Sequence, residues 1–232
     1  MDNSSAPVVV VLDGPAGTGK STVSREIAAR LGLSFLDTGA MYRAVTYWML
    51  ANEVDVDDSD AVAVASDKPA VVSGTDAEGP TITVDGVDVS GPIREQAVTA
   101  AVSAVSAVPE VRSRMVELQR ASAVAAPRGI VAEGRDMGTV VFPQADLKVF
   151  LTASAETRAA RRAAQLGITD TDEIAAILVD INRRDAADSG RATAPLRKAD
   201  DAVEVDTSEM SPEQVITHII GLVRDRAAAR LG

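Results

Sequence analysis

The chain has 232 residues, no cysteine and a formal net charge of −11 at neutral pH. This length suits one domain, or one domain with an insert, around a sizeable core. The acidic balance argues against general affinity for nucleic acids or anionic membranes, and aromatic residues, at 3%, are too few for a base-stacking platform. The absence of cysteine excludes a disulfide framework, and no signal sequence or membrane span is visible. We therefore expect a cytoplasmic protein that binds neither nucleic acid nor membrane. We also expect it to be a monomer.

A glycine-rich stretch follows the first predicted strand. We expect residues 1–7 to form a disordered tail and residues 8–232 to form the domain. The β-branched apolar run 8–12 predicts a buried strand, and Val23, Ile27 and Leu31 fall at helical spacing. Between them lies a match to the phosphate-loop pattern G-x-x-x-x-G-K-[ST], formed by Gly14, Pro15, Ala16, Gly17, Thr18, Gly19, Lys20 and Ser21. The flanking strand and helix favour a phosphate site over a glycine turn without a ligand.

The chemistry of such a loop is anion binding. Glycines let successive backbone N–H groups turn inward, and the N-terminus of the next helix adds free N–H groups and its positive dipole end. Lys20 supplies a mobile positive charge for the outer phosphates of a nucleotide, and the Ser21 hydroxyl suits a Mg²⁺ ligand. Asp13, directly before the loop, either binds Mg²⁺ through water or accepts hydrogen bonds from loop N–H groups.

Strands and helices alternate through most of the chain. A strand at 33–36 and a helix after Asp37 precede a stretch of different character at about 52–92. There Ser59 could cap a short helix at 60–66, and three short strands at 70–73, 81–84 and 87–89 include an Asp85–Gly86 hairpin signal. Small antiparallel elements after two β-α units indicate an insert.

The second half resumes the alternation. It predicts helices at 93–107, 109–125, 154–167 and 171–187, core strands at 129–133, 147–151 and 202–205, and a last helix opened by a capping box at Ser211. A polar loop is expected at 134–138, at the carboxyl end of the strand 129–133. The alternation implies an α/β fold in which helices cover both faces of a parallel sheet.

The positions of several arginines indicate which class of reaction the phosphate loop serves. Several lie in or beside predicted loops or helix ends on the ligand side of the sheet, namely Arg43, Arg112, Arg135, Arg184 and Arg191. Converging guanidinium groups suit a second phosphate group or a transferring phosphoryl group. For Arg158 and Arg162 a solvated surface pair is an equal alternative. Asp136 either accepts hydrogen bonds from an amine or a sugar hydroxyl, or merely orients Arg135.

These motifs together resemble the bacterial cytidylate kinases. The resemblance rests on four stretches beyond the phosphate loop: 36–43 (LDTGAMYR), 88–94 (DVSGPIR), 133–143 (EGRDMGTVVFP) and 184–196, with Arg184, Asp185, Asp188, Ser189, Arg191 and Ala194–Leu196. It covers nearly the whole chain after the tail. The Gly-Arg-Asp-Met-Gly stretch is specific to this family, whereas the phosphate loop is not. Thr38 stands where many relatives have serine.

The resemblance implies a P-loop NTPase-type three-layer fold, with a five-stranded parallel sheet, a small antiparallel monophosphate-binding insert at about 52–92 and a mobile lid at about 158–190. It implies transfer of the γ-phosphoryl group of ATP to CMP or dCMP with Mg²⁺. ATP would be held by the phosphate loop, Thr22 and Arg161, and Mg²⁺ by Ser21 and Asp13. The residues implied to hold the acceptor are Thr38, Arg43, Ser103, Arg112, Arg135, Asp136, Asp188 and Arg191. Those implied to assist transfer are Lys20, Arg135, Arg184 and Arg191, and the arginines of helix 154–167 would close over ATP.

Two other functions fit the phosphate loop by itself. One is a kinase for another small acceptor, such as UMP or shikimate. The other is a GTPase-type switch, for which we would expect an Asn-Lys-x-Asp guanine signature, and the chain contains none.

Overall fold

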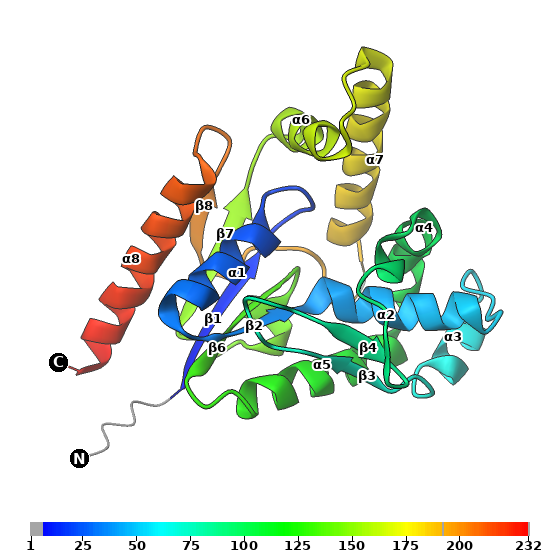
Figure 1. Ribbon diagram of the computed structural model, residues 1–232, viewed down its shortest axis with the longest axis horizontal. Helices are drawn as coiled ribbons and strands as arrows, with labels where there is room; N and C mark the ends of the chain where they lie inside the picture. The colour runs from blue at the N-terminus through cyan, green and yellow to red at the C-terminus, as the bar shows by residue number, and fades with distance from the viewer. Residues whose placement is uncertain (1–6, 192, 232) are drawn as a thin grey trace. The chain divides into compact units, whose positions relative to one another are not determined.

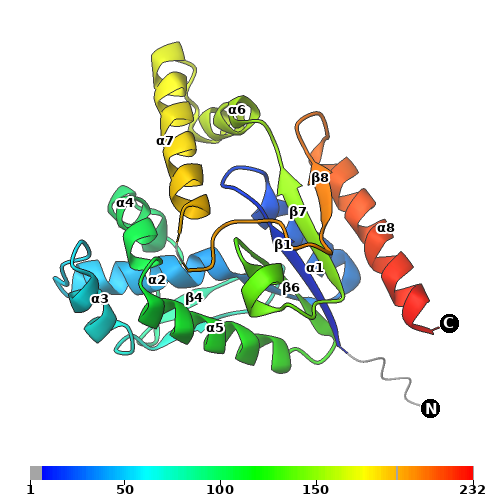
Figure 2. The same ribbon diagram turned by 180° about the vertical axis from the view of Figure 1, so that it is seen from behind.

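The computed structural model describes residues 7–191 and 193–231, so the tail expected at 1–7 lies, except for Pro7, outside the described residues. Figures 1 and 2 show the ribbon from opposite sides. The elements are β1 (Val8–Asp13), α1 (Lys20–Leu31), β2 (Ser34–Asp37), α2 (Thr38–Ala51), α3 (Ser59–Ala65), β3 (Val71–Ser73), β4 (Ile82–Val84), β5 (Val87–Asp88), η1 (Pro92–Arg94), α4 (Gln96–Val105), α5 (Pro109–Val124), β6 (Gly129–Gly134), η2 (Met137–Val141), β7 (Leu147–Thr152), α6 (Ala155–Leu166), α7 (Thr171–Ser189), β8 (Val203–Asp206) and α8 (Pro212–Leu231).

The larger sheet has five strands in the order β2-β6-β1-β7-β8, and β3, β4 and β5 form a smaller antiparallel sheet. Strand β1 pairs in parallel with β7, and β7 pairs in parallel with β8. Val10, Val11 and Leu12 of β1 are fully buried, as expected for a strand covered on both faces. The predicted α/β class, with a five-stranded sheet and a small antiparallel insert, is confirmed.

The chain divides into two compact units. The first unit holds residues up to Val8 and Ala28–Ala132, and in it α2 packs against α4, η1, β3 and β4. The second unit holds Val9–Ile27 and Glu133–Gly232, and in it α6 lies beside α7 while α8 packs against β7 (Figure 1).

Local signals in the sequence predicted several turns and caps correctly. Asp85 and Gly86 both have positive φ, 52° and 80°, as a type I′ hairpin turn requires. The capping box before α8 is present, because the Ser211 N–H donates to Gln214 Oε1 and the Gln214 N–H donates to Ser211 Oγ.

Three local predictions were wrong. Helix α3 is capped by Asp58 rather than Ser59, because the Asp58 carboxylate accepts the N–H groups of Asp60 and Ala61. The helix expected at 93–107 is interrupted at Glu95, whose extended backbone (φ −60°, ψ 156°) separates η1 from α4. The loop expected at 134–138 leads into a π-helix, η2.

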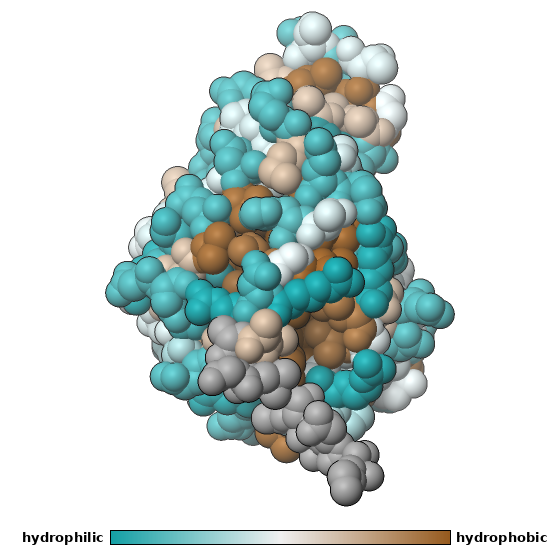
Figure 3. Space-filling view, turned by 90° about the vertical axis from the view of Figure 1, so that its left-hand side faces the viewer, coloured by the Kyte–Doolittle hydropathy of each residue, from teal (hydrophilic) through white to brown (hydrophobic). Residues whose placement is uncertain are grey.

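Polar residues cover most of the face drawn in Figure 3, in keeping with a chain in which a quarter of the residues are charged. Within the described residues, no helix combines the length and the apolar character that a bilayer crossing requires.

Candidate functional site

The phosphate loop joins β1 to α1 in the second unit. Gly14, Gly17 and Gly19 have φ values of 146°, 83° and 89°, which side chains rarely allow. A Cβ on Gly14 would lie 2.1 Å from the carbonyl oxygen of Leu151 in β7, whereas a Cβ on Gly19 would meet no atom within 4 Å. The backbone therefore needs glycine at Gly14 for close packing on the sheet, and the loop is open at Gly19, where a ligand could approach.

Lys20 begins α1 and is almost completely buried. Its Nζ donates to the carbonyl oxygen of Pro15 at 2.7 Å, inside the loop. Burial, with the nearby Arg135 guanidinium, lowers the pKa of Lys20 to about 7, although the carboxylates of Glu133, Asp13 and Asp188 oppose the shift. The positive charges of Lys20 and Arg135 thus repel each other, and an anion bound near both would relieve that repulsion.

Asp13 ends β1, and both of its carboxylate oxygens accept backbone hydrogen bonds. The Met137 N–H donates to Oδ1 at 2.9 Å and the Gly138 N–H donates to Oδ2 at 2.8 Å. Burial raises the pKa of Asp13 to about 6, and these two hydrogen bonds limit the rise. Asp13 therefore accepts loop N–H bonds, but its donors follow the Gly-Arg-Asp stretch rather than belonging to the phosphate loop, a pairing that sequence spacing could not reveal.

Asp188, at the end of α7, joins two arginines. Its Oδ2 accepts from Nε of Arg135 at 2.8 Å, and its Oδ1 accepts from Nη2 of Arg191. Arg135 is also bonded to the Gly134 carbonyl oxygen. A single buried carboxylate thereby orients two guanidinium groups, one from the end of β6 and one from the segment after α7.

The remaining arginines of the second unit differ from one another. Arg158 is only 5% exposed, so its interpretation as a solvated surface pair is wrong, whereas Arg162 is exposed. Arg161 donates to the hydroxyl and carbonyl oxygens of Thr207. Nε of Arg184 lies 3.0 Å from the Asp180 carboxylate. Arg158 contacts the phosphate loop itself, and no pattern in the sequence signalled that contact.

The first unit gathers its own set of predicted residues around α2. Thr38 begins this helix and is buried, and Arg43 lies 3.7 Å from the cap residue Asp37. The Arg112 guanidinium lies over the Tyr42 ring, 5.6 Å from its centroid. Tyr42 is 8% exposed and belongs to the buried core. Ser103, the fourth predicted member, is on α4, which packs against α2.

Asp136 is placed in the second unit with Arg135, Asp188 and Arg191. Its side chain is 3% exposed. The eight residues predicted to hold the acceptor are therefore split, with four in each unit.

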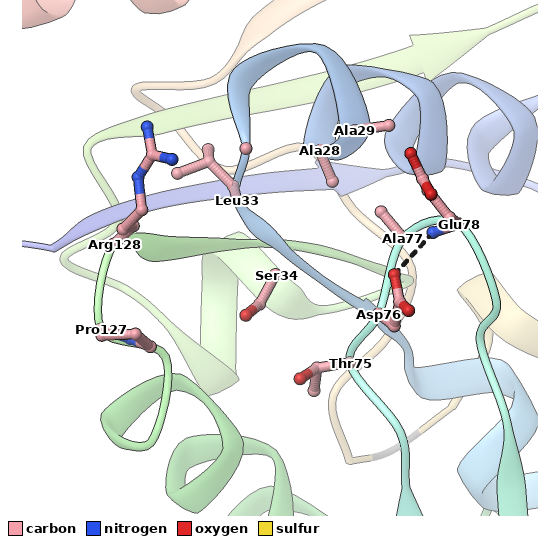
Figure 4. A pocket seen from close by; sticks show the side chains of 11 residues that line it. Ala28, Ala29, Leu33, Ser34, Thr75, Asp76, Ala77, Glu78, Pro127 and Arg128 are labelled. Atoms are coloured by element: carbon pink, nitrogen blue, oxygen red, sulfur yellow. Dashed lines mark hydrogen bonds between the residues drawn. The ribbon is translucent and has the colours of Figure 1, made fainter.

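A separate pocket of about 460 Å³ lies in the first unit, between the end of α1, the start of β2 and the segment 75–78 (Figure 4). Arg128, Asp76 and Glu78 are among its lining residues, and the Glu78 N–H donates to Asp76 Oδ1. None of the predicted site residues lines it. This pocket is therefore not part of the predicted phosphate-binding site.

The loop fits a nucleotide phosphate with Mg²⁺. There is open space beside Gly19, and Lys20 follows it directly at the start of α1. The hydroxyl-bearing residues Ser21 and Thr22 are exposed in the first turn of that helix. Among the described residues, no group of three or more histidine or acidic side chains could hold a metal ion. Mg²⁺ that is bound by nucleotide phosphates needs only one or two protein ligands, so Ser21 suffices as the candidate.

Comparison with known proteins gives relatives over nearly the full length. The cytidylate kinase of Streptomyces coelicolor is 60% identical over 234 aligned positions, which cover 99% of this chain and all of that one. The cytidylate kinase of Streptomyces avermitilis is 56% identical with the same coverage. A solved structure of an uncharacterized protein from Eubacterium ventriosum shares the fold, with a TM-score of 0.50 at 11% identity over 95% of this chain and 99% of that chain.

The sequence model of the cytidylate kinase family matches residues 10–225. That range contains the phosphate loop, the residues Lys20, Arg135 and Asp188, and the residues around α2 that are predicted to hold the acceptor. The chain therefore belongs to the cytidylate kinase family.

Proposed function

We propose that this protein transfers the γ-phosphoryl group of ATP to CMP or dCMP, giving ADP and CDP or dCDP. The observation that carries the proposal is the clustering of Lys20, Arg135, Asp188 and Arg191 beside a glycine loop in a chain that matches the cytidylate kinase family from 10 to 225. Phosphoryl transfer needs positioning and charge neutralisation rather than a protein nucleophile, and these residues supply both.

On the donor side, the backbone N–H groups of residues 14 and 16–22 would hold the phosphates of ATP, and Arg161 would border the nucleotide. Lys20 would leave the Pro15 carbonyl oxygen for an outer phosphate oxygen, whose charge would restore the ordinary pKa of the lysine. Mg²⁺, when bound, would neutralise part of the phosphate charge. Ser21 would hold the ion, and Asp13, whose oxygens already accept two N–H bonds, could bind only a water molecule of its coordination shell.

On the acceptor side, Arg43, Arg112 and Arg135 would neutralise the CMP phosphate, with the Thr38 hydroxyl among its partners. Ser103 and Asp136 would form hydrogen bonds with the cytosine edge or with groups next to it. Asp188 and Arg191 would contact the sugar. Buried polar groups that lose their partners make the wrong base unfavourable, and this effect would favour CMP over UMP.

During transfer, an oxygen of the CMP phosphate attacks the γ-phosphorus, and the bond to the β-phosphate oxygen breaks to release ADP. Lys20, Arg135, Arg184 and Arg191 would stabilise the charge spread over the transferring oxygens. The segment at about 158–190 would act as the lid that excludes water.

A steady-state assay of ADP release with ATP and CMP, dCMP, UMP or shikimate tests the proposal. We expect turnover with CMP and dCMP at low concentration and weak turnover with the other two. Equal use of UMP would remove the cytosine selectivity, and tight GTP binding without CMP binding would favour the GTPase-type switch. Sedimentation analysis and cell fractionation test the predicted monomeric state and cytoplasmic location.

A further inference from the structure

We propose that Arg158 is a positioning residue that fixes the phosphate loop for the donor nucleotide and joins the loop to the arginine-holding end of α7. Arg158 is in the first turn of α6 and is nearly fully buried. Its Nε donates to the Ala153 carbonyl oxygen at 3.1 Å, and its Nη1 donates to the Ala16 carbonyl oxygen at 3.1 Å. Its Nη2 lies 2.7 Å from Oδ2 of Asp185. One guanidinium group therefore holds three separate segments of the second unit.

The contact with Ala16 controls the direction of a loop N–H group. A peptide unit is planar and trans, so the Ala16 carbonyl and the Gly17 N–H point in opposite directions. When Arg158 holds the carbonyl oxygen, the Gly17 N–H is aimed away from Arg158. The side-chain stem also leaves little room for any side chain at Gly17, because a Cβ there would lie 3.1 Å from Cβ of Arg158. Arg158 thus sets the orientation of a donor that a phosphate-binding loop needs.

The contact with Asp185 connects this loop to α7. Asp185 is three residues before Asp188, the carboxylate that accepts from Arg135 and Arg191. Its Oδ2 is bonded to Arg158, and its Oδ1 is buried without a hydrogen-bond partner among the described residues. Since Asp185 depends on Arg158, the guanidinium group ties the end of α7, with its two oriented arginines, to the loop that would hold ATP.

A lysine could not replace this arginine. Lysine carries the charge at one point on a flexible stem, whereas the planar guanidinium holds Ala153, Ala16 and Asp185 at once. Charge alone would therefore leave the phosphate loop unfixed. The inference rests on the proposed use of ATP, but nucleotide binding can be measured without any acceptor.

The test compares Arg158→Lys and Asp185→Asn with the wild type. We expect Arg158→Lys to raise the KM for ATP and the Kd for ADP by about tenfold, which corresponds to about 1.4 kcal/mol. The KM for CMP should change much less. Asp185→Asn should shift the same constants in the same direction by a smaller factor. The matched control is Arg183→Lys, because Arg183 is on α7, is 62% exposed and pairs with Asp180.

Thermal melts establish that each variant is folded. If Arg158→Lys does not fold, the ADP affinity of Asp185→Asn decides the matter. Unchanged ADP affinity in the folded variants would overturn the proposal, and so would equal increases in the KM for ATP and for CMP. A wild-type protein that binds ADP but does not phosphorylate CMP would refute the proposed function and leave this test valid.

Discussion

Asp188 is the residue that orients most of the charge beside the phosphate loop. It accepts hydrogen bonds from Arg135 and Arg191, and its charge also acts on Lys20. Two guanidinium groups from distant parts of the sequence are therefore oriented by one carboxylate. Such preorganisation is the main source of rate enhancement in phosphoryl transfer, because the protein need not rearrange during the reaction.

Substitution of Lys20 tests the donor side at the residue scale. Lys20→Ala removes the cation nearest the outer phosphates, so we expect kcat to fall by on the order of 10²–10³-fold. Steady-state kinetics measure the loss, and a thermal melt checks the fold. Wild-type turnover in a folded variant would exclude Lys20 from the transfer step.

Substitution of Arg135 tests the acceptor side. Arg135→Ala should raise the KM for CMP at least about tenfold more than the KM for ATP, since a charge-assisted bond to the acceptor phosphate is lost. The matched control is Arg128→Ala, because Arg128 is exposed just before the same strand, β6. A larger effect on ATP than on CMP would mean that the two nucleotide sites have been exchanged.

Single residues were the least predictable level of the site. The loop glycines and Lys20 could be predicted because the spacing of the phosphate-loop pattern directly reflects how the loop binds phosphate. Asp13 was left between two roles because its donors, Met137 and Gly138, are more than 120 positions away in the sequence. The sequence left two interpretations of Arg158 open, a solvated surface pair and a residue of the site. Its partners Ala16 and Asp185 are also remote in the sequence, and only the folded chain brings them together.

Helices and strands with a clear apolar run or a regular spacing of apolar residues were predicted well. Helix ends at which neighbouring residues compete for the same role were not. Strand β1 and helix α1 follow from an apolar run and helical spacing. By contrast, Asp58 competes with Ser59 for the cap of α3, and two adjacent polar candidates cannot be ranked from the sequence alone. The interruption of the helix at Glu95 could not be predicted, because no glycine marks it and the nearest proline, Pro92, lies three residues earlier.

The segment after the Gly-Arg-Asp stretch depends on a buried lysine of β7. Lys148 is 7% exposed, and its Nζ donates to the Pro143 carbonyl oxygen at 2.7 Å and to Asp201 Oδ1 at 2.8 Å. Its methylene groups also lie against Gly138, where a Cβ would be 3.1 Å from Cδ. Lys148 therefore joins the segment that follows η2 to the residues that precede β8.

Removal of Asp201 tests this support through its pH dependence. The hydrogen bond from Lys148 holds the pKa of Asp201 below its usual 3.8. A lowered carboxyl pKa stabilises the fold above 3.8, and that stabilisation is lost as the pH falls further. Asp201→Asn should thus lower the free energy of unfolding at pH 7 by on the order of 1 kcal/mol, because solvent screens this exposed partner.

Urea unfolding at pH 7 and pH 3 measures the effect, and Asp200→Asn, at an exposed neighbouring carboxylate, is the control. The difference between wild type and Asp201→Asn should shrink at pH 3. A difference that is the same at both pH values would contradict the ion pair.

For the whole molecule, the order of strands and helices carried most of the predictive information. Alternating β and α segments restrict the topologies to parallel sheets covered on both faces, and the short strands at 70–89 stood out as an insert. The division into two units was not foreseen, because it joins the start of the chain to Ala28–Ala132 rather than isolating the insert. The residues predicted to hold the acceptor divide between the units in chain order, with the four at 38–112 in the first unit and the four at 135–191 in the second.

The central proposal is that the glycine loop holds the phosphates together with Lys20 and three arginines, Arg43, Arg135 and Arg191. A crystal structure with an analogue that links adenosine and cytidine through phosphates tests it most directly. We predict that Lys20, Arg43, Arg135 and Arg191 will lie within hydrogen-bond distance of phosphate oxygens. Phosphates bound to the loop while these three arginines point elsewhere would contradict the account.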